Sequence, residues 1–94
     1  MKQHRYQVTL HHLADPDGNP ADRPPLQFEV GNHDDIFAIV ERMRQRTDFT
    51  PEAATALGVG LKLFSEVMLE NRDHPLFASF RPHFAEFMKE LKKG

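Results

Sequence analysis

Apolar and polar residues alternate in two short stretches near the N-terminus. Residues 6–11 read YQVTLH and residues 26–31 read LQFEVG, so every second side chain is apolar. A period of two is typical of a β-strand with one apolar face. The segment 14–25 between them holds four Pro, four Asp or Asn residues and Gly18, all of which favour turns. We therefore expect an antiparallel β-hairpin over residues 4–31.

After the hairpin, apolar residues recur at steps of three and four. Asn32, followed by Asp34 and Asp35, has the pattern of a helix N-cap with acidic residues in the first turn. A first helix is therefore expected over about 33–46. Its apolar stripe, which we expect to cover the hairpin, consists of Ile36, Phe37, Ile39, Val40 and Met43.

The clearest helix signal lies in the middle of the chain. Thr50-Pro51-Glu52 combines an N-cap residue, a proline at the first helical position and an acid in the first turn. The pattern predicts a second helix over 51–70. Two apolar stripes leave only a narrow polar strip around Lys62, Glu66 and Glu70. A helix that is apolar on most sides is typically central.

Two glycines interrupt this second helix. Gly58 and Gly60 together cost roughly 2 kcal/mol relative to alanine. With Ala54 and Ala56 four residues earlier, they form two stripes of small residues on different faces of the helix. We expect two neighbouring elements to approach the helix closely there; a dimer formed through this helix is the alternative.

A third helical region is expected over 74–92, with Asp73 as its cap. Pro82 lies inside its pattern, where a proline removes a hydrogen bond and clashes with the preceding turn at a cost of about 3 kcal/mol. We therefore expect a break near Phe80 and Arg81 and a new start at Pro82. The predicted fold is α+β, a two-stranded antiparallel hairpin followed by three helices (ββααα). It forms a single domain over residues 1–94, with the apolar hairpin face packed on the helices.

Charge and composition narrow the classes of function. Twelve Lys and Arg against fourteen Asp and Glu give a net charge of -2, so no strong field attracts nucleic acid or an anionic membrane. Cysteine is absent, which removes disulfides and thiolate chemistry. No apolar run has the length of a signal peptide or a membrane span. We expect a cytoplasmic protein.

Metal sites are poorly supported by the spacing of the candidate ligands. Asp15, Asp17 and Asn19 alternate as in a calcium loop, but Pro20 and Leu26 stand where that loop needs a glycine and a bidentate glutamate. The six histidines are scattered, and the adjacent pair His11-His12 would point to opposite faces of a strand. We expect no metal and no cofactor.

Catalytic motifs are lacking as well. His33, Asp34 and Asp35 stand where α/β enzymes often place acid–base groups, although helix capping explains the same residues. The two serines, Ser65 and Ser79, fall within predicted helices and outside any nucleophile elbow. The run Gly58-Val59-Gly60 lies in a helix and lacks the phosphate-loop sequence. We expect no enzyme.

Four segments resemble a known family. They are Pro24-Pro25-Leu26-Gln27-Phe28-Glu29-Val30, Asn32-His33-Asp34-Asp35-Ile36, Gly58-Val59-Gly60-Leu61-Lys62-Leu63 and His74-Pro75-Leu76-Phe77. Over nearly its whole length the chain is similar to a family of short, uncharacterised bacterial proteins classed as a domain of unknown function. The resemblance implies a bacterial origin and a stand-alone domain, and it implies no catalytic or binding residue.

The leading functional hypothesis is a non-catalytic protein-interaction module, homodimeric or with another protein partner. It would pair through an edge strand or through the apolar stripe of the C-terminal helix, because a domain this small has difficulty covering so many large side chains. The alternative is a small-molecule-binding or metabolic accessory protein with a site at His33, Asp34 and Asp35. The candidate interface residues are Phe80, Phe84, Phe87, Met88 and Leu91.

Overall fold

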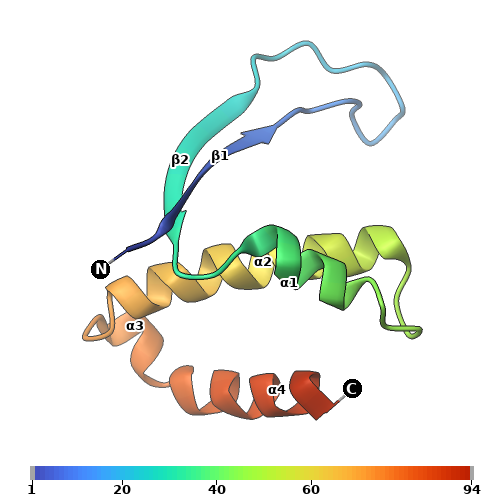
Figure 1. Cartoon of the computed structure of the whole chain (residues 1–94). Coiled ribbons are helices and arrows are strands. Elements are labelled where there is room, and N and C mark those ends of the chain that lie inside the picture. Colours follow the sequence, from blue (N-terminus) through green and yellow to red (C-terminus); the bar gives the residue numbers. More distant parts are fainter. Residues whose placement is uncertain (1, 94) are drawn as a thin grey trace.

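The chain folds into a β-hairpin, a pair of packed helices and a C-terminal helical segment (Figure 1). This computed structural model describes residues 2–93. Its elements confirm the α+β class and the predicted order. They are β1 (His4–Leu10), β2 (Leu26–Asn32), α1 (Ile36–Met43), α2 (Pro51–Glu70), α3 (Pro75–Ala78) and α4 (Arg81–Lys93).

The two strands pair antiparallel, as predicted, and the turn residues order the long loop between them. Val8 lies opposite Phe28 and Leu10 opposite Leu26, so the apolar residues share one face of the hairpin. In the loop, the Asp15 carboxylate accepts hydrogen bonds from the backbone N–H of Asp17 and Asn19. The Asp and Asn residues therefore act as turn formers, as expected from the sequence.

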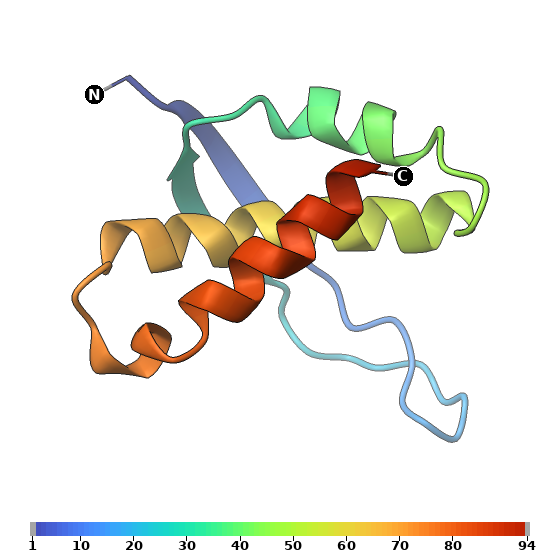
Figure 2. The same cartoon turned by 90° about the horizontal axis from the view of Figure 1, so that it is seen from below.

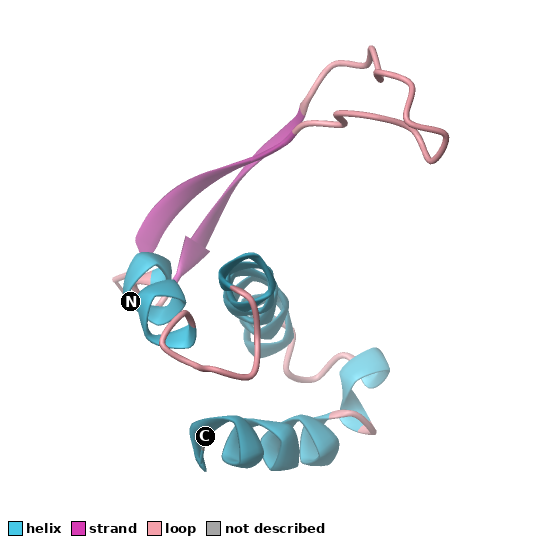
Figure 3. Cartoon of the chain, turned by 90° about the vertical axis from the view of Figure 1, so that its right-hand side faces the viewer, coloured by secondary structure: helices cyan, strands magenta, loops and turns pink. Residues whose placement is uncertain are grey.

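The expected packing of the apolar hairpin face on the helices holds only for the part of the hairpin nearest to them. The hairpin leaves the helices at the β2–α1 junction and rises away from α2, with its loop at the far end (Figures 1 and 3). Leu10 is 63%, Leu26 59% and Phe28 41% exposed. Tyr6, Val8 and Val30, nearer the helices, are half-buried, and the Tyr6 ring contacts that of Phe37 in α1.

Helix α1 starts later than expected. Its N-cap is Asp35, whose carboxylate accepts from the backbone N–H of Phe37 and Ala38. Asn32 cannot serve as the cap because its side chain is bonded to α2 and to the backbone of Asp34. The predicted stripe is also wrong at Phe37, which is 77% exposed.

Helix α2 spans the predicted residues and starts as predicted, with the Thr50 hydroxyl accepting from the Ala53 N–H at 3.1 Å. Gly58 is the close contact with α1. A Cβ there would lie 3.4 Å from side-chain atoms of both Val40 and Met43. The second predicted contact is wrong within the fold, because no atom lies within 4 Å of a Cβ placed at Gly60.

The C-terminal helical region breaks where the proline pattern predicts. Its cap is His74 instead of Asp73: the His74 ring accepts from the N–H of Leu76. The chain turns after Ala78, and α4 begins at Arg81 with Pro82 in its first turn, where the missing N–H costs nothing. Helix α4 crosses in front of α2 in the view from below (Figure 2). Phe64 of α2 makes edge contacts with the rings of Phe77, Phe80 and Phe84.

Candidate functional site

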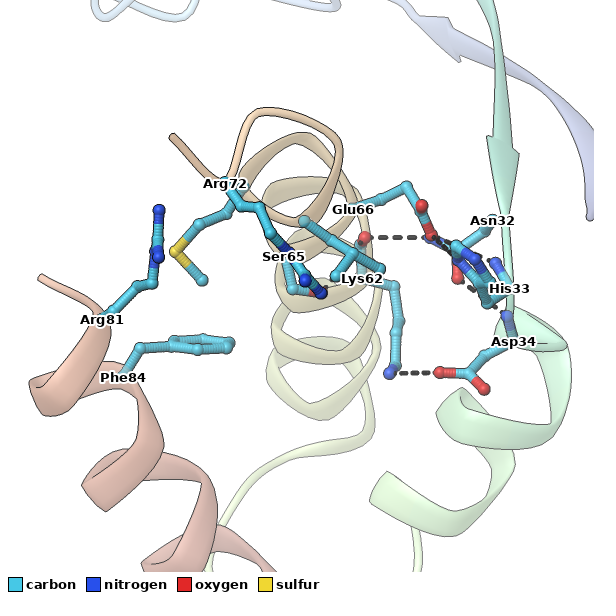
Figure 4. A pocket seen from close by; sticks show the side chains of 11 residues that line it. Asn32, His33, Asp34, Lys62, Ser65, Glu66, Arg72, Arg81 and Phe84 are labelled. Carbon is cyan, nitrogen blue, oxygen red and sulfur yellow. Dashed lines mark hydrogen bonds and ion pairs between the residues drawn. The ribbon is translucent and has the colours of Figure 1, made fainter. Parts of the chain in front are cut away.

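The predicted site at the start of α1 faces a pocket of about 470 Å³ (Figure 4). One wall is the β2–α1 junction, another is the middle of α2, and the third is the start of α4. Its charged lining consists of His33, Asp34, Lys62, Glu66, Arg72 and Arg81. The structure therefore places two of the three predicted residues, His33 and Asp34, around one pocket. It leaves Asp35 outside, because that carboxylate caps α1.

Glu66 is the buried anchor of this site. Glu66 is 7% exposed and lies on a helix that is otherwise largely apolar. Its Oε1 accepts from the backbone N–H of His33 at 3.1 Å and lies 2.9 Å from His33 Nδ1. Its Oε2 accepts from Gln3 Nε2 at 3.2 Å. One carboxylate therefore joins α2 to both strands' ends, so that its burial is compensated by hydrogen bonds.

Asn32 makes the second link between the junction and α2. It is 2% exposed. Its Nδ2 donates to the Lys62 carbonyl at 2.9 Å, and its Oδ1 accepts from the Asp34 N–H at 3.0 Å. The amide is the right group here because a single side chain must donate to one backbone group and accept from another.

Asp34 and Lys62 form the exposed ion pair of the pocket, with Asp34 Oδ2 2.6 Å from Lys62 Nζ. The hydrogen bond from the Lys62 ammonium lowers the pKa of Asp34 below its ordinary value of 3.8, and its effect outweighs the opposing effect of partial burial. The Asp34 side chain is 51% exposed, so solvent screens much of this attraction.

Removing this carboxylate should change how stability depends on pH. Because the pKa of folded Asp34 is lowered, its stabilising effect is present above pH about 4 and is lost as the pH falls through the folded pKa. Asp34→Asn should therefore be less stable than the parent near pH 7, and the gap should close below pH about 4. Urea unfolding across this range measures it. Lys62→Met should show the same convergence, and a gap that stays constant with pH would contradict the assignment.

Most residues of the site were not predicted as site residues, among them Asn32, Lys62, Glu66, Arg72 and Arg81. Lys62 and Glu66 belong to the polar strip that the sequence shows on an otherwise apolar helix. A polar side chain that is buried requires a hydrogen-bond partner, so the polar strip was the feature of the sequence that could have indicated these contacts. Asn32 was expected as a helix cap, and its true partner lies thirty residues away along the chain.

The charged groups of the pocket differ in whether they are paired. Asp34 and Glu66 already have partners, whereas no side-chain hydrogen bond or ion pair of Arg72 or Arg81 is formed within residues 2–93. The Ser65 hydroxyl lies at the pocket wall, 3.4 Å from the Lys62 carbonyl oxygen.

In the described part of the chain, no group of three or more His, Asp or Glu residues could hold a metal ion. No helix there is long and apolar enough to cross a membrane.

The five candidate interface residues of α4 divide between two environments. Phe80 and Phe87 are 40% and 44% exposed. Phe84, Met88 and Leu91 are half-buried and line a second cavity, which lies between α1, α2 and α4. The apolar stripe of α4 is therefore partly turned towards the fold and partly open.

One solved structure matches the whole chain. It is the crystal structure of a protein of unknown function from Pectobacterium atrosepticum, which is 41% identical. The match covers 99% of this chain and 100% of that chain, with a TM-score of 0.85. The similar protein is thus a bacterial protein with the same fold.

Among curated proteins of established identity, none matches. One family model does, over residues 4–93, and it is described as a domain of unknown function with a solved structure, DUF3861. This match spans both strands and all four helices, in agreement with the resemblance seen in the sequence. The chain therefore belongs to the DUF3861 family.

Proposed function

We propose that the protein is a non-catalytic interaction module that works as a homodimer. The observation that carries this proposal is its surplus of surface. A compact monomer of 10.9 kDa exposes about 5,600 Å², whereas this chain exposes 7496 Å². Its radius of gyration is 15.7 Å, against about 12 Å for a compact domain of this length. The surplus, roughly 1,900 Å² per chain, is of the size that obligate homodimers bury.

The far half of the hairpin supplies part of this surface. Leu10, Leu26 and Phe28 share one face and are all more than 40% exposed. Both edges of the two-stranded sheet are also open within the described chain. An isolated hairpin is marginally stable in water, and an uncovered apolar strand edge invites pairing with another chain. A second copy of the chain that covers this half would stabilise the hairpin and pair with its open strand edge.

An exposed face of α2 supplies the other part. Ala53, Ala56, Gly60 and Val67 recur at steps of three, four and seven, and all four are exposed. A Cβ at Gly60 would meet no atom within 4 Å, so nothing within the fold accounts for a residue that weakens the helix by about 1 kcal/mol. Small residues at these steps let a second backbone approach closely. The self-association surface is therefore defined as Leu10, Leu26, Phe28, Ala56 and Gly60.

Gly60→Arg should convert the dimer to a monomer without harming the fold. The folded chain has open space at this position and arginine favours helix, so the monomer should be at least as stable as the parent. A large charged side chain would prevent close approach of a second α2. Light scattering at micromolar concentration, with circular dichroism to confirm folding, measures the effect.

Ala85→Arg is the matched control, because Ala85 is an exposed small residue on α4, outside the self-association surface. It should leave the dimer intact. A parent protein that is monomeric at the same concentrations would contradict the proposal, as would a dimer that survives Gly60→Arg together with Phe28→Lys.

A small-molecule site at His33 and Asp34 is the second candidate function. The observation that favours it is the pair of open guanidinium groups, Arg72 and Arg81, over the pocket. Arginine recognises carboxylates and phosphates by paired hydrogen bonds. Binding of a carboxylate that depends on these two arginines would support this candidate, and binding that is independent of them would contradict it.

A further inference from the structure

A second cavity, of about 570 Å³, lies between α1, α2 and α4. This volume is within the range of small-molecule sites, roughly 300–1,000 Å³. Side chains from all three helices form an apolar wall. They are Ile39, Met43, Leu61, Phe84, Met88 and Leu91. The site therefore offers an apolar slot that no side chain of the described chain fills.

The charged residues around this slot are all basic. Arg42, Arg46, Lys62 and Lys92 line it, and no aspartate or glutamate does. Arg46 is paired with Asp48 at 2.8 Å and Lys62 with Asp34 at 2.6 Å. Arg42 and Lys92 make no ion pair within residues 2–93.

Their positions near the ends of α1 and α4 suit the helix dipoles. The helix dipoles do not explain why no aspartate or glutamate lines the slot.

A hydrogen bond links two segments that line this cavity. Arg46 Nη1 donates to the Leu91 carbonyl at 3.1 Å, which ties the end of α1 to the last turn of α4. The slot also lies apart from the self-association surface: none of the five residues of that surface lines it, and the hairpin and α4 lie on opposite sides of α2 (Figure 3). A ligand in the slot and a second copy on the hairpin side are thus compatible.

We infer that this cavity binds a linear aliphatic carboxylate. The chain lies among the apolar side chains of α1, α2 and α4, and the carboxylate faces Arg42 and Lys92. Apolar walls with a cationic mouth match this ligand class, since the tail leaves water while the head keeps charged partners. The inference is independent of the proposed dimer.

Calorimetric titration of the full chain with decanoate tests the site. Decanoate should bind, and decanol, which has the same chain without the charge, should bind about tenfold more weakly. Each methylene added between hexanoate and decanoate should raise the affinity about fourfold, as expected for a chain entering an apolar slot.

Charge reversal identifies the end of the slot that holds the head group. The double variant Arg42→Glu with Lys92→Glu should lower decanoate affinity about tenfold or more. The matched control is Arg5→Glu with Arg23→Glu, which reverses two exposed basic residues of the hairpin, outside the slot, and should leave the affinity unchanged. Both pairs are exposed, and circular dichroism confirms that the variants fold.

Several outcomes would overturn the inference. They are equal binding of decanol and decanoate, an affinity independent of chain length, and equal losses in the two double variants. Binding to phosphatidylglycerol vesicles without binding to free decanoate would assign the basic rim to a membrane surface instead. Decanoate that dissociates the dimer would show that a second copy occupies the slot.

Discussion

Glu66→Ala is expected to lower the free energy of unfolding by about 3 kcal/mol. Glu66 is 7% exposed, and its carboxylate has three partners: the His33 N–H, the His33 ring and the Gln3 amide. Truncation would leave a buried backbone N–H without an acceptor and open space beside it. Urea denaturation at constant protein concentration measures the change.

Two variants distinguish the loss of the bonds made by Glu66 from the general effect of removing an acidic residue from α2. Glu70→Ala removes an exposed carboxylate whose bond to Gln3 is longer, at 3.3 Å, and should cost less than about 1 kcal/mol. Glu66→Gln keeps an acceptor for the His33 N–H and should fall between the two. If Glu66→Ala were no more costly than Glu70→Ala, the anchoring role would be refuted.

The reason for so large an effect is the scarcity of apolar packing around the hairpin. Within the described chain, the buried hydrophobic residues are Ile36, Met43, Ala54 and Met68, and none lies on a strand. The hairpin is instead held at its base by polar groups, among them Tyr6, whose hydroxyl accepts from the Ile36 N–H at 2.9 Å. A polar attachment depends on complete pairing, so the loss of one member costs more than the average hydrogen bond.

Features encoded within a few residues could be predicted from the sequence. Helix α2 spans the predicted residues, and its start is determined locally by Thr50, Pro51 and Glu52. The break before α4 follows in the same way from Pro82, which cannot continue a helix without clashing with the turn before it.

Features that depend on distant partners could not be predicted. Asn32 has the sequence pattern of a cap, but α2 recruits its amide and leaves the capping to Asp35. The burial of Glu66 depends on a strand end more than thirty residues away in sequence. Sequence spacing shows that a residue can cap or pair, whereas the tertiary structure decides between competing partners.

The hairpin and Gly60 also show that a sequence pattern does not identify the partner of a surface. Alternation correctly placed Val8 and Phe28 on one face, but it carries no information about what covers that face. The glycine pattern likewise predicted close contacts, which the fold supplies at Gly58 and not at Gly60. Both uncovered features belong to the self-association surface, and a second copy would supply the partner that the single chain lacks.

Asn32→Ala is expected to cost about 2 kcal/mol and to loosen the hairpin. The amide joins the Lys62 carbonyl to the Asp34 N–H, and the residue itself is 2% exposed. Because this residue ends β2, amide hydrogen exchange should accelerate along both strands more than along α2.

Asn71→Ala is its matched control, since the Asn71 side chain also donates to a helix carbonyl, that of Val67 at 2.8 Å, but in an exposed position. Water replaces that bond, so its loss should be less than about 1 kcal/mol and should leave strand exchange unchanged. Equal losses in the two variants would show that burial adds nothing at Asn32. A loss confined to Asn32 with faster strand exchange would instead establish that this one amide couples the hairpin to the helices, and through them to the surface proposed for self-association.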